Sequence, residues 1–562
     1  MKKLPYGISD LKRIKSENYY YIDKTHFIPK LENLNASFLL FLRPRRFGKS
    51  LLIAMLEAYY DKYYEKDFVT LFKDTYILNH KTKEASSYFI LKFDFSSIDI
   101  NDVENSFRSY LNITINTFLK SYDIKIKQDE NPINRFNSIM AYFKEDKTLN
   151  LYILIDEYDN FSNKLLLLNK SNYKNTIAEK TASFKQFFTT LKAGASGNDA
   201  PIKRVFITGV TPMTLYDVTS GFNIGKNISL NPIFNDMVGV TEDELSLMLK
   251  DYDIELDDYN KTLLQEWYNN YKFSKDTKHT IYNTDMILYF MDNMLTFNKA
   301  PDELIDINVR SDYSKLRDII YTNKKLNGNF QTLNTLISGE SIAIDSLIQD
   351  FSALNISKEE NFKSLMFYLG LVTIKDADLR VNLQIPNETI KRIDIDFLKD
   401  SLELENIFTL KTTKLSEHLV EFALNGDIEV FNFLAQEIKR NSAIRDYIYN
   451  EQTIKSMYLA YLSLTNYFVV QSEAELNKGF VDLFLKPLNP YVKYMGLIEL
   501  KYIKRATKVT KELINNLISE AKEQLEIYEK DGIVTKFLRD GKKLKKVVLV
   551  FHGWELVKSK II

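Results

Sequence analysis

The chain has 562 residues, of which 45% are hydrophobic and 27% are charged. This composition excludes a disordered or collagen-like protein and favours about three or four folded domains. The 75 basic and 75 acidic residues balance, so contact with a polyanion would have to come from a local patch. Because the chain has no cysteine, disulfides, thiolate zinc sites and cysteine nucleophiles are excluded. The histidines show no metal-ligand spacing.

Export and membrane signals are absent from the sequence pattern. Residues 1–13 are charged and lack the apolar segment of a signal peptide. The longest apolar runs, such as residues 38–42 and 547–551, are strand-length, whereas a bilayer requires roughly 18 residues. We therefore expect a cytoplasmic protein with no membrane partner.

The order of apolar runs predicts three regions of an α/β protein. In residues 1–240, short strands at 38–42, 88–95, 151–155 and 205–209 alternate with helices, the pattern of a parallel sheet. Residues 241–400 begin with a capping-box pattern from Thr241 to Glu244 and read as a helical lid. Two strand-like runs at 371–374 and 379–385 suggest a winged-helix-like hairpin there. Residues 401–562 read as a separate α/β domain.

A phosphate-binding loop is predicted directly after the first strand. Residues 43–50 (RPRRFGKS) lie between that strand and an amphipathic helix, the context that a Walker A loop requires. Lys49 can neutralise nucleotide phosphates and Ser50 can ligate Mg²⁺. The first glycine of the usual loop is replaced by Arg43, and a basic turn before a core helix is the alternative interpretation. The expected nucleotide-binding residues are Arg45, Arg46, Phe47, Gly48, Lys49 and Ser50.

Two further strands end in residues suited to ATP hydrolysis. The strand at 151–155 is followed by Asp156 and Glu157, which we expect to hold Mg²⁺ and to polarise the attacking water, respectively. A solvated acidic turn is the alternative interpretation. Thr208, at the end of the next strand, is the candidate sensor of the γ-phosphate. ATP and Mg²⁺ are therefore the expected cofactors.

These segments carry a resemblance to a known family. The chain resembles the bacterial AAA-ATPase-like family in residues 4–7 (LPYG), 21–25 (YIDKT), 43–50, 155–159, 208–211 (TGVT), 220–223 (SGFN) and 271–273 (YKF). The resemblance implies a P-loop ATPase core and makes the RPRRFGKS loop a family trait. Members commonly carry a nuclease-fold domain at the C-terminus, which directs attention to the last region.

Carboxylates in the last region are spaced like those of a nuclease. Asp482 lies in one strand, and Glu499 and Lys501 lie two residues apart in the next, so the latter two share a face. Two carboxylates can hold Mg²⁺ against a phosphate while the lysine orients water. Two edge strands with ordinary alternating charge are the alternative interpretation.

This spacing resembles the PD-(D/E)XK nuclease core. The resemblance implies that Asp482 and Glu499 are metal ligands and that Lys501 is the catalytic lysine. It further suggests Glu451 as a metal ligand and Gln524 as an orienting residue, and it places Glu473 where relatives also have a glutamate. Residues 501–546 contain 13 Lys/Arg and 7 Asp/Glu, a basic excess that favours contact with phosphate backbones.

Two functions from different classes remain open at this point. The first is an ATPase coupled to a Mg²⁺-dependent nuclease acting on nucleic acid, DNA rather than RNA, with mobile-element defence as a conceivable setting. The second is a nucleotide-switched binding or regulatory protein whose nuclease fold does not cut. A chaperone-like machine acting on protein is a third, weaker alternative. The sequence leaves open whether the chain works as a monomer or as a homo-oligomer.

Overall fold

A computed structural model describes residues 2–562 except 169–181, 198, 220–224, 321–327, 357, 405–407, 442–447, 449 and 478. The chain divides into two compact units: Met1–Thr322 with Ala343–Asn387, and Asn323–Ile342 with Glu388–Ile562. The boundaries that we expect at residues 240 and 400 stay predictions.

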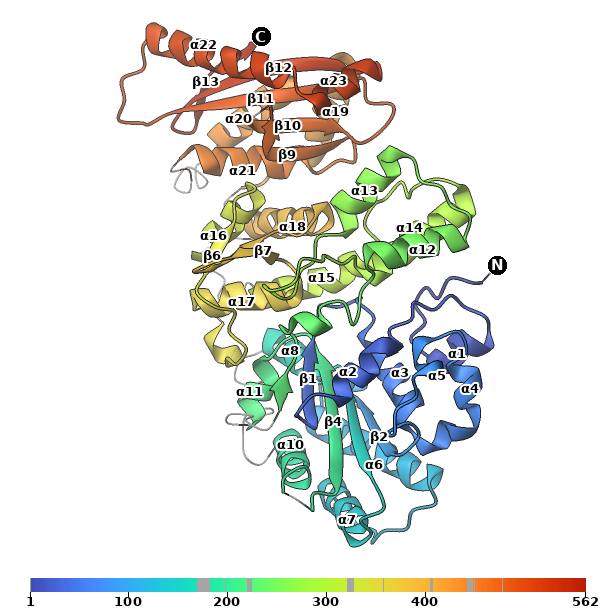
Figure 1. The fold of residues 1–562 in the computed structure, drawn as a ribbon. Helices are drawn as coiled ribbons and strands as arrows, with labels where there is room; N and C mark the ends of the chain where they lie inside the picture. The colour runs from blue at the N-terminus through green and yellow to red at the C-terminus, as the bar shows by residue number, and fades with distance from the viewer. Residues whose placement is uncertain are drawn as a thin grey trace. The chain divides into compact units, whose positions relative to one another are not determined.

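The first unit is built on a parallel sheet with the strand order β2-β3-β4-β1-β5 (Figure 1). β1 and β3 are buried at every position, as expected for central strands of a parallel sheet covered on both faces. The four predicted strands are confirmed, and a short fifth strand is added. The strands are β1 (Phe38–Leu42), β2 (Phe89–Asp94), β3 (Leu151–Asp156), β4 (Ile202–Gly209) and β5 (Lys226–Asn227).

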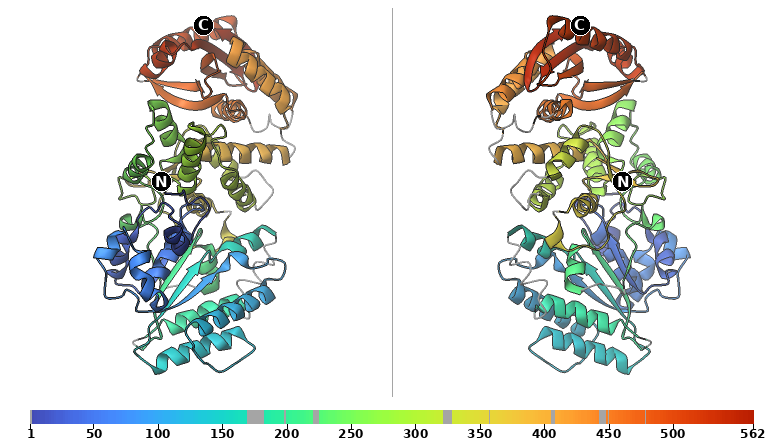
Figure 2. Two further views of the ribbon diagram at one scale, coloured as in Figure 1. Left: turned by 90° about the vertical axis from the view of Figure 1, so that its right-hand side faces the viewer. Right: turned by 90° about the vertical axis from the view of Figure 1, so that its left-hand side faces the viewer.

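Helices cover both faces of this sheet. The N-terminal helices α1 to α5 lie on one side of the strands, and α6, α7 and α10 lie on the other (Figures 1 and 2). The helices of this part are α1 (Leu11–Ser16), α2 (Ile28–Glu32), α3 (Lys49–Tyr60), α4 (Phe68–Leu71), α5 (Tyr76–Asn79), α6 (Val103–Ser121), α7 (Pro132–Glu145), α8 (Asn160–Leu168), α10 (Ser183–Gly194) and α11 (Met213–Thr219). This is the doubly covered architecture of a P-loop ATPase core.

The middle of the chain is helical, as predicted. Thr241 and Glu244 form the expected capping box at the start of α12, because each side chain bonds the backbone N–H of the other residue. The predicted hairpin is also present, as the antiparallel strands β7 (Thr373–Ala377) and β8 (Val381–Gln384) beside β6 (Ile342–Ile344). The helices are α12 (Glu242–Asp251), α13 (Asp258–Tyr268), α14 (Thr284–Phe297), α15 (Ile307–Ile320) and α17 (Glu359–Leu369).

The second unit contains a mixed sheet with the strand order β13-β12-β11-β10-β9. β11 pairs antiparallel with β10 and parallel with β12. The first strand of this sheet in chain order, β9, runs from Phe468 to Leu476. The strands are β9 (Phe468–Leu476), β10 (Gly479–Pro487), β11 (Tyr494–Ile503), β12 (Lys543–His552) and β13 (Glu555–Ile561).

A helix packs along one face of the second sheet and closes its core. α22 buries Ile518, Ala521 and Leu525 against Phe484 and Val548 of the strands. The other helices of this unit are α16 (Gly328–Ile337), α18 (Glu388–Leu404), α19 (Thr412–Asn425), α20 (Glu429–Arg440), α21 (Glu451–Leu462) and α23 (Gly532–Arg539), and α22 spans Lys511–Tyr528. Among the described residues, none of the helices has the length and apolar character that crossing a membrane requires.

Candidate nucleotide and nuclease sites

Arg43, which replaces the first glycine of a Walker A loop, is a buried structural residue. Its guanidinium donates hydrogen bonds to the carbonyl oxygens of Leu42, Ser229 and Phe234 at 2.7–2.9 Å. It also lies 4.5 Å from the ring centre of Phe41. Burial lowers the pKa of Arg43 to about 9. The side chain therefore joins β1 to the segment after β5 and cannot reach a nucleotide.

The rest of the loop takes a left-handed turn into α3. Arg46 has φ 67° and Gly48 has φ 96°, a conformation that only glycine adopts without strain. Phe47 is fully buried, with its ring 4.9 Å from Tyr271 and 5.5 Å from Phe273 in edge-to-face packing. Residues 271–273, which belong to the family resemblance, thus pack against the phosphate loop through Phe47. Phe47 contributes backbone and packing rather than a side-chain ligand.

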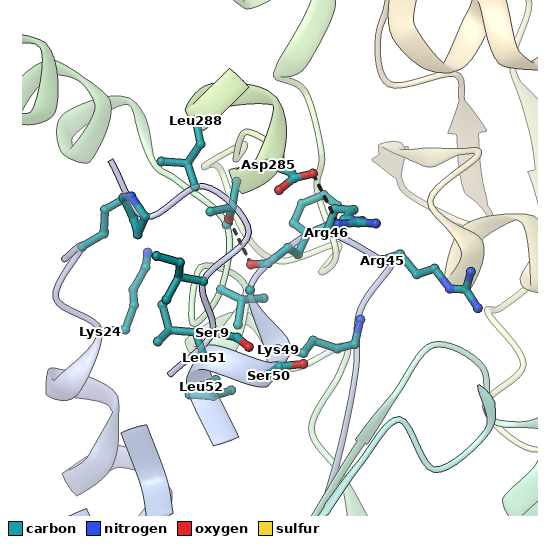
Figure 3. A pocket seen from close by; sticks show the side chains of 18 of the residues that line it. Ser9, Lys24, Arg45, Arg46, Lys49, Ser50, Leu51, Leu52, Asp285 and Leu288 are labelled. Carbon is teal, nitrogen blue, oxygen red and sulfur yellow. Dashed lines mark hydrogen bonds and ion pairs between the residues drawn. The ribbon is translucent and has the colours of Figure 1, made fainter. Parts of the chain in front are cut away.

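A cavity of about 490 Å³ lies over this loop, within the range of roughly 300–1,000 Å³ usual for small-molecule sites. Lys49, Ser50 and Glu157 line it, together with Arg45 and Arg46. Figure 3 shows Lys49 and Ser50 at the start of α3, with Ser9 and Lys24 of the N-terminal segment close by. Residues of the LPYG and YIDKT segments, which the sequence marked only as family motifs, also line the cavity: Pro5, Gly7, Tyr21, Ile22 and Lys24.

Ser50 and Asp156 are brought together as Mg²⁺ binding requires. A hydrogen bond from the Ser50 hydroxyl reaches the Asp156 carboxylate, and it lowers a pKa that burial raises. Lys49 donates to the Pro44 carbonyl at 2.8 Å, and burial lowers its pKa against the opposing charge of Glu157. A hydroxyl beside a buried carboxylate is a hard oxygen donor set that suits Mg²⁺. Ser50 and Asp156 therefore fit the ion that nucleotide phosphates carry.

Glu157 lies at the end of β3 in a strained conformation. Its φ is 46°, its side chain accepts a hydrogen bond from the amide of Asn160, and the residue lines the cavity. Burial, followed by the effect of Asp156, raises the pKa of Glu157. A positive φ at a non-glycine residue is costly and is found preferentially at functional sites. The placement suits a base that acts on water in the cavity.

Two acidic residues of the helical region hold the loop arginines, and the sequence did not reveal them. Asp312 of α15 lies 2.7 Å from Nε of Arg46 and 3.4 Å from Arg45. Asp285 of α14 lies 3.7 Å from Arg46, as the dashed line in Figure 3 marks. Burial raises the pKa of Asp285 to about 6. Neither acid belongs to a local motif, so only the fold pairs them with the loop.

Thr208 and Asp159 occupy positions away from the cavity. Thr208 is fully buried at the end of β4, with no hydrogen-bond partner for its hydroxyl among the described residues, and it is not among the cavity-lining residues. Asp159 accepts hydrogen bonds from the N–H groups of Val210 and Thr211 at 3.1 and 2.7 Å. Asp159 therefore ties β3 to the end of β4, and the sensor role of Thr208 stays a prediction.

The second site lies where β10 and β11 pair. Leu483 faces Ile498 in the antiparallel register, so the preceding residue, Asp482, lies opposite Glu499 on the same face. Both carboxylates are buried, at 8% and 2% exposed. The backbone N–H of Leu500 donates to Oδ2 of Asp482 at 2.7 Å. The predicted pair is thus assembled by the hairpin.

Glu499 has an unused oxygen in this site. Its Oε1 is buried without a hydrogen-bond partner among the described residues, and its Oε2 lies 3.4 Å from Nζ of Lys501. Burial, then the charge of Asp482, raises the pKa of Glu499 to about 8. Lys501 also donates to Oε1 of Gln524 at 2.8 Å. A buried free carboxylate oxygen beside a second carboxylate fits a divalent cation, for which both supply hard oxygen ligands.

A lysine that the sequence analysis missed enters the same cluster. Nζ of Lys455, on α21, lies 2.7 Å from Oδ1 of Asp482 and also contacts Glu473. Glu451, one helical turn before it, has a pKa that is raised by burial and then by Asp482. Among the described residues, no group of three or more His, Cys, Asp or Glu side chains is arranged to hold a metal ion, so Glu451 as a third ligand stays a prediction.

The first unit has the fold of a P-loop nucleotide-binding core and the second is an α/β domain with a mixed sheet, and comparison with protein families agrees. Residues 5–219 match the family model described as "Predicted AAA-ATPase". Residues 449–561 match the family model of the PD-(D/E)XK nuclease superfamily. The chain therefore carries an AAA-ATPase-like domain and a PD-(D/E)XK nuclease-superfamily domain. The SGFN segment at 220–223 lies outside the described residues.

Individual proteins show weaker similarity. A protein of Azotobacter chroococcum mcd 1, "Uncharacterized protein in vnfD 5'region", is 25% identical over 404 residues, which cover 69% of this chain and 68% of the relative. Two solved structures are also similar: Cdc6p from Pyrobaculum aerophilum (9% identity, TM-score 0.26, 69% of this chain and 98% of that one) and the Aeropyrum pernix ORC2 protein (10% identity, TM-score 0.27, 70% and 98%). TM-scores this low define no shared arrangement.

Proposed function

We propose that the protein binds and hydrolyses ATP and that its C-terminal domain is a Mg²⁺-dependent endonuclease acting on DNA. The proposal places Lys49, Ser50 and Asp156 on the nucleotide and its Mg²⁺, and Glu157 on the attacking water. It assigns a second metal to Asp482 and Glu499, with Lys501 as the catalytic lysine. Cleavage of foreign DNA in defence against mobile elements is a role that such a pair of domains would suit.

The ATPase half is supported by the cavity over the phosphate loop. Lys49, Ser50 and Glu157 converge on it, although they come from two segments far apart in the sequence. An ammonium, a hydroxyl bonded to a buried carboxylate, and a carboxylate of raised pKa are the groups that position a triphosphate and activate water. Turnover by one chain or across a homo-oligomer interface would use the same residues.

The nuclease half is supported by one observation above the others, the buried and unpartnered Oε1 of Glu499. Burial, the charge of Asp482 and a hydrogen bond between the two side chains raise the pKa of Glu499, and a divalent cation shared with Asp482 would take the place of the proton between them. Lys501 is held by Gln524 beside the pair, where an ammonium can orient water or stabilise charge on a phosphate.

The test is a cleavage assay on the purified full chain with plasmid DNA and with single-stranded DNA and RNA oligonucleotides. ATP and Mg²⁺ are each present or absent, and released phosphate is measured in the same samples. We expect Mg²⁺-dependent DNA cleavage that changes with ATP. ATP hydrolysis with nucleic-acid binding but no cleavage under any condition would instead support the nucleotide-switched binding protein.

A further inference from the structure

Lys455 places a positive charge inside the carboxylate cluster of the second site. Its Nζ lies 2.7 Å from Oδ1 of Asp482 and contacts Oε1 of Glu473 as well. The side chain is only 8% exposed, so the ammonium has exchanged its hydration for these two carboxylates. The lysine is therefore a charged member of the cluster.

Glu473 is directed at the cluster by a distortion of β9. Its φ is 50°, which a non-glycine residue adopts only at a cost. The residues on either side of it, Ser472 and Ala474, pair with Leu483 and Val481 of β10. Glu473 thus stands opposite Asp482, where two like charges would repel each other without a cation between them. Lys455 supplies that cation in the metal-free protein.

Each oxygen of Asp482 has a protein partner. Oδ2 accepts the N–H of Leu500 at 2.7 Å, and Oδ1 accepts from Lys455. The neighbouring Glu499 is hydrogen-bonded to Asp482, and its Oε1 has no further partner among the described residues. A divalent ion shared by the two carboxylates can use the second lone pair of an Asp482 oxygen, but at Oδ1 it competes with the ammonium of Lys455 for the same negative charge. A divalent ion and the ammonium of Lys455 would also repel each other if both lay against the same carboxylate.

We propose that Lys455 is a positioning residue that occupies Oδ1 of Asp482 and would be displaced when a divalent ion binds the two carboxylates, after which Glu473 alone would retain the lysine. The inference rests on the proposed metal site of the nuclease domain. In the metal-free protein, the lysine keeps the buried carboxylates from repelling each other. Metal binding then has to displace an internal cation, which sets the ion concentration at which the nuclease domain becomes loaded.

The first test is calorimetric titration of the full chain with Mn²⁺, without ATP or nucleic acid. Heat that disappears in Glu499→Gln belongs to this site. We expect Lys455→Met to bind Mn²⁺ there at least about tenfold more tightly than the parent chain, because no ammonium has to leave. Lys522→Met, which removes an exposed lysine paired at i,i+4 with Glu526, is the matched control and should leave the affinity unchanged.

Thermal unfolding supplies a readout that does not depend on activity. In EDTA, Lys455→Met should melt at a lower temperature than the parent, because Asp482 and Glu473 lose their shared cation. Adding Mn²⁺ should raise the melting temperature of Lys455→Met by more than it raises that of the parent chain. Equal or weaker Mn²⁺ binding by Lys455→Met overturns the exchange. If the parent and Glu499→Gln bind Mn²⁺ alike, the proposed metal site itself fails, so the two failures are distinguishable.

If Lys455→Met does not fold, two milder variants still test whether Lys455 and Glu473 act together on metal binding. Glu473→Gln retains the lysine but removes its second carboxylate, so we expect Mn²⁺ affinity to fall about threefold or more. The Glu473→Gln change is also made in a chain that already carries Lys455→Arg, which keeps a cation at residue 455. There its effect on the Mn²⁺ affinity should differ from its effect in the parent chain, because the effects of residues that act together are not additive. Additive effects would show that Glu473 does not act through residue 455.

Discussion

The guanidinium of Arg43 lies 4.4 Å from the ring centre of Phe273, which places the first residue of the phosphate loop in contact with a segment of the helical region. The arginine also donates to the backbone of Ser229 and Phe234. These contacts explain why an arginine can occupy the position at which a Walker A loop usually has its first glycine. The first residue of the loop points away from the cavity and anchors the loop, and Arg46 and Gly48 take the left-handed conformations of the turn.

Replacing Arg43 should therefore damage the fold rather than repair the loop. We expect Arg43→Gly to lower the free energy of unfolding by about 3 kcal/mol or more, since several buried carbonyl groups lose their donor. Chemical denaturation of the full chain measures this. Arg108→Gly is a control on an exposed face. An Arg43→Gly chain of unchanged stability would contradict the anchoring role.

Lys49→Ala should abolish ATP binding, because it removes the point charge that opposes the β- and γ-phosphates. Titration with a fluorescent ATP analogue measures the affinity. The exposed Lys144 of α7 offers the control Lys144→Ala, which should bind normally. Unchanged affinity in Lys49→Ala would remove the phosphate loop from the nucleotide site.

Glu157→Gln should retain ATP but lose hydrolysis, since the amide keeps the shape of the side chain and cannot take a proton. A base works in its deprotonated form, and burial raises the pKa of Glu157. As the pH is lowered, the hydrolysis rate of the parent chain should therefore begin to fall at a higher pH than the one at which an ordinary glutamate titrates. Phosphate release measured across pH provides the profile, and normal turnover by Glu157→Gln would assign the base to another residue.

Asp482→Ala and Glu499→Ala should each eliminate Mg²⁺-dependent cleavage while ATP hydrolysis continues, because the two sites lie in different units. Lys501→Ala should abolish cleavage but keep metal binding close to normal, since an ammonium is not a ligand. Mn²⁺ should replace Mg²⁺, because both prefer oxygen ligands, whereas Ca²⁺ should bind without supporting much cleavage. Cleavage that survives either carboxylate change would favour the binding-protein alternative.

The raised pKa of Glu499, about 8, makes the stability of the metal-free protein depend on pH. Between the ordinary glutamate pKa and about 8, the folded chain holds a proton that the unfolded chain releases. This group therefore stabilises the fold fully at low pH, and its contribution is lost as the pH rises through about 8. Melting in EDTA from about pH 6 to about pH 9 should show the decline, and Glu499→Gln should flatten it.

Local pattern determined much of the fold and of the candidate chemistry. The apolar runs that became β1 and β3 are buried throughout, so hydrophobic content alone identified them. The capping box at Thr241 was predictable because its partners are three residues apart. Glu499 and Lys501 share a face because strand residues alternate. Each of these features depends on neighbours within one element.

Other features required the tertiary structure, because their partners are distant in the chain. The buried position of Arg43 is explained only by Ser229 and Phe273. Similarly, the ion pair of Lys455 with Asp482 needs a helix to pack against β10. The sequence determined which chemical groups each segment carries and in what order. Tertiary packing alone decided which of those groups are desolvated together, and desolvation sets their pKa values, their partners and whether an oxygen is left free for a metal ion.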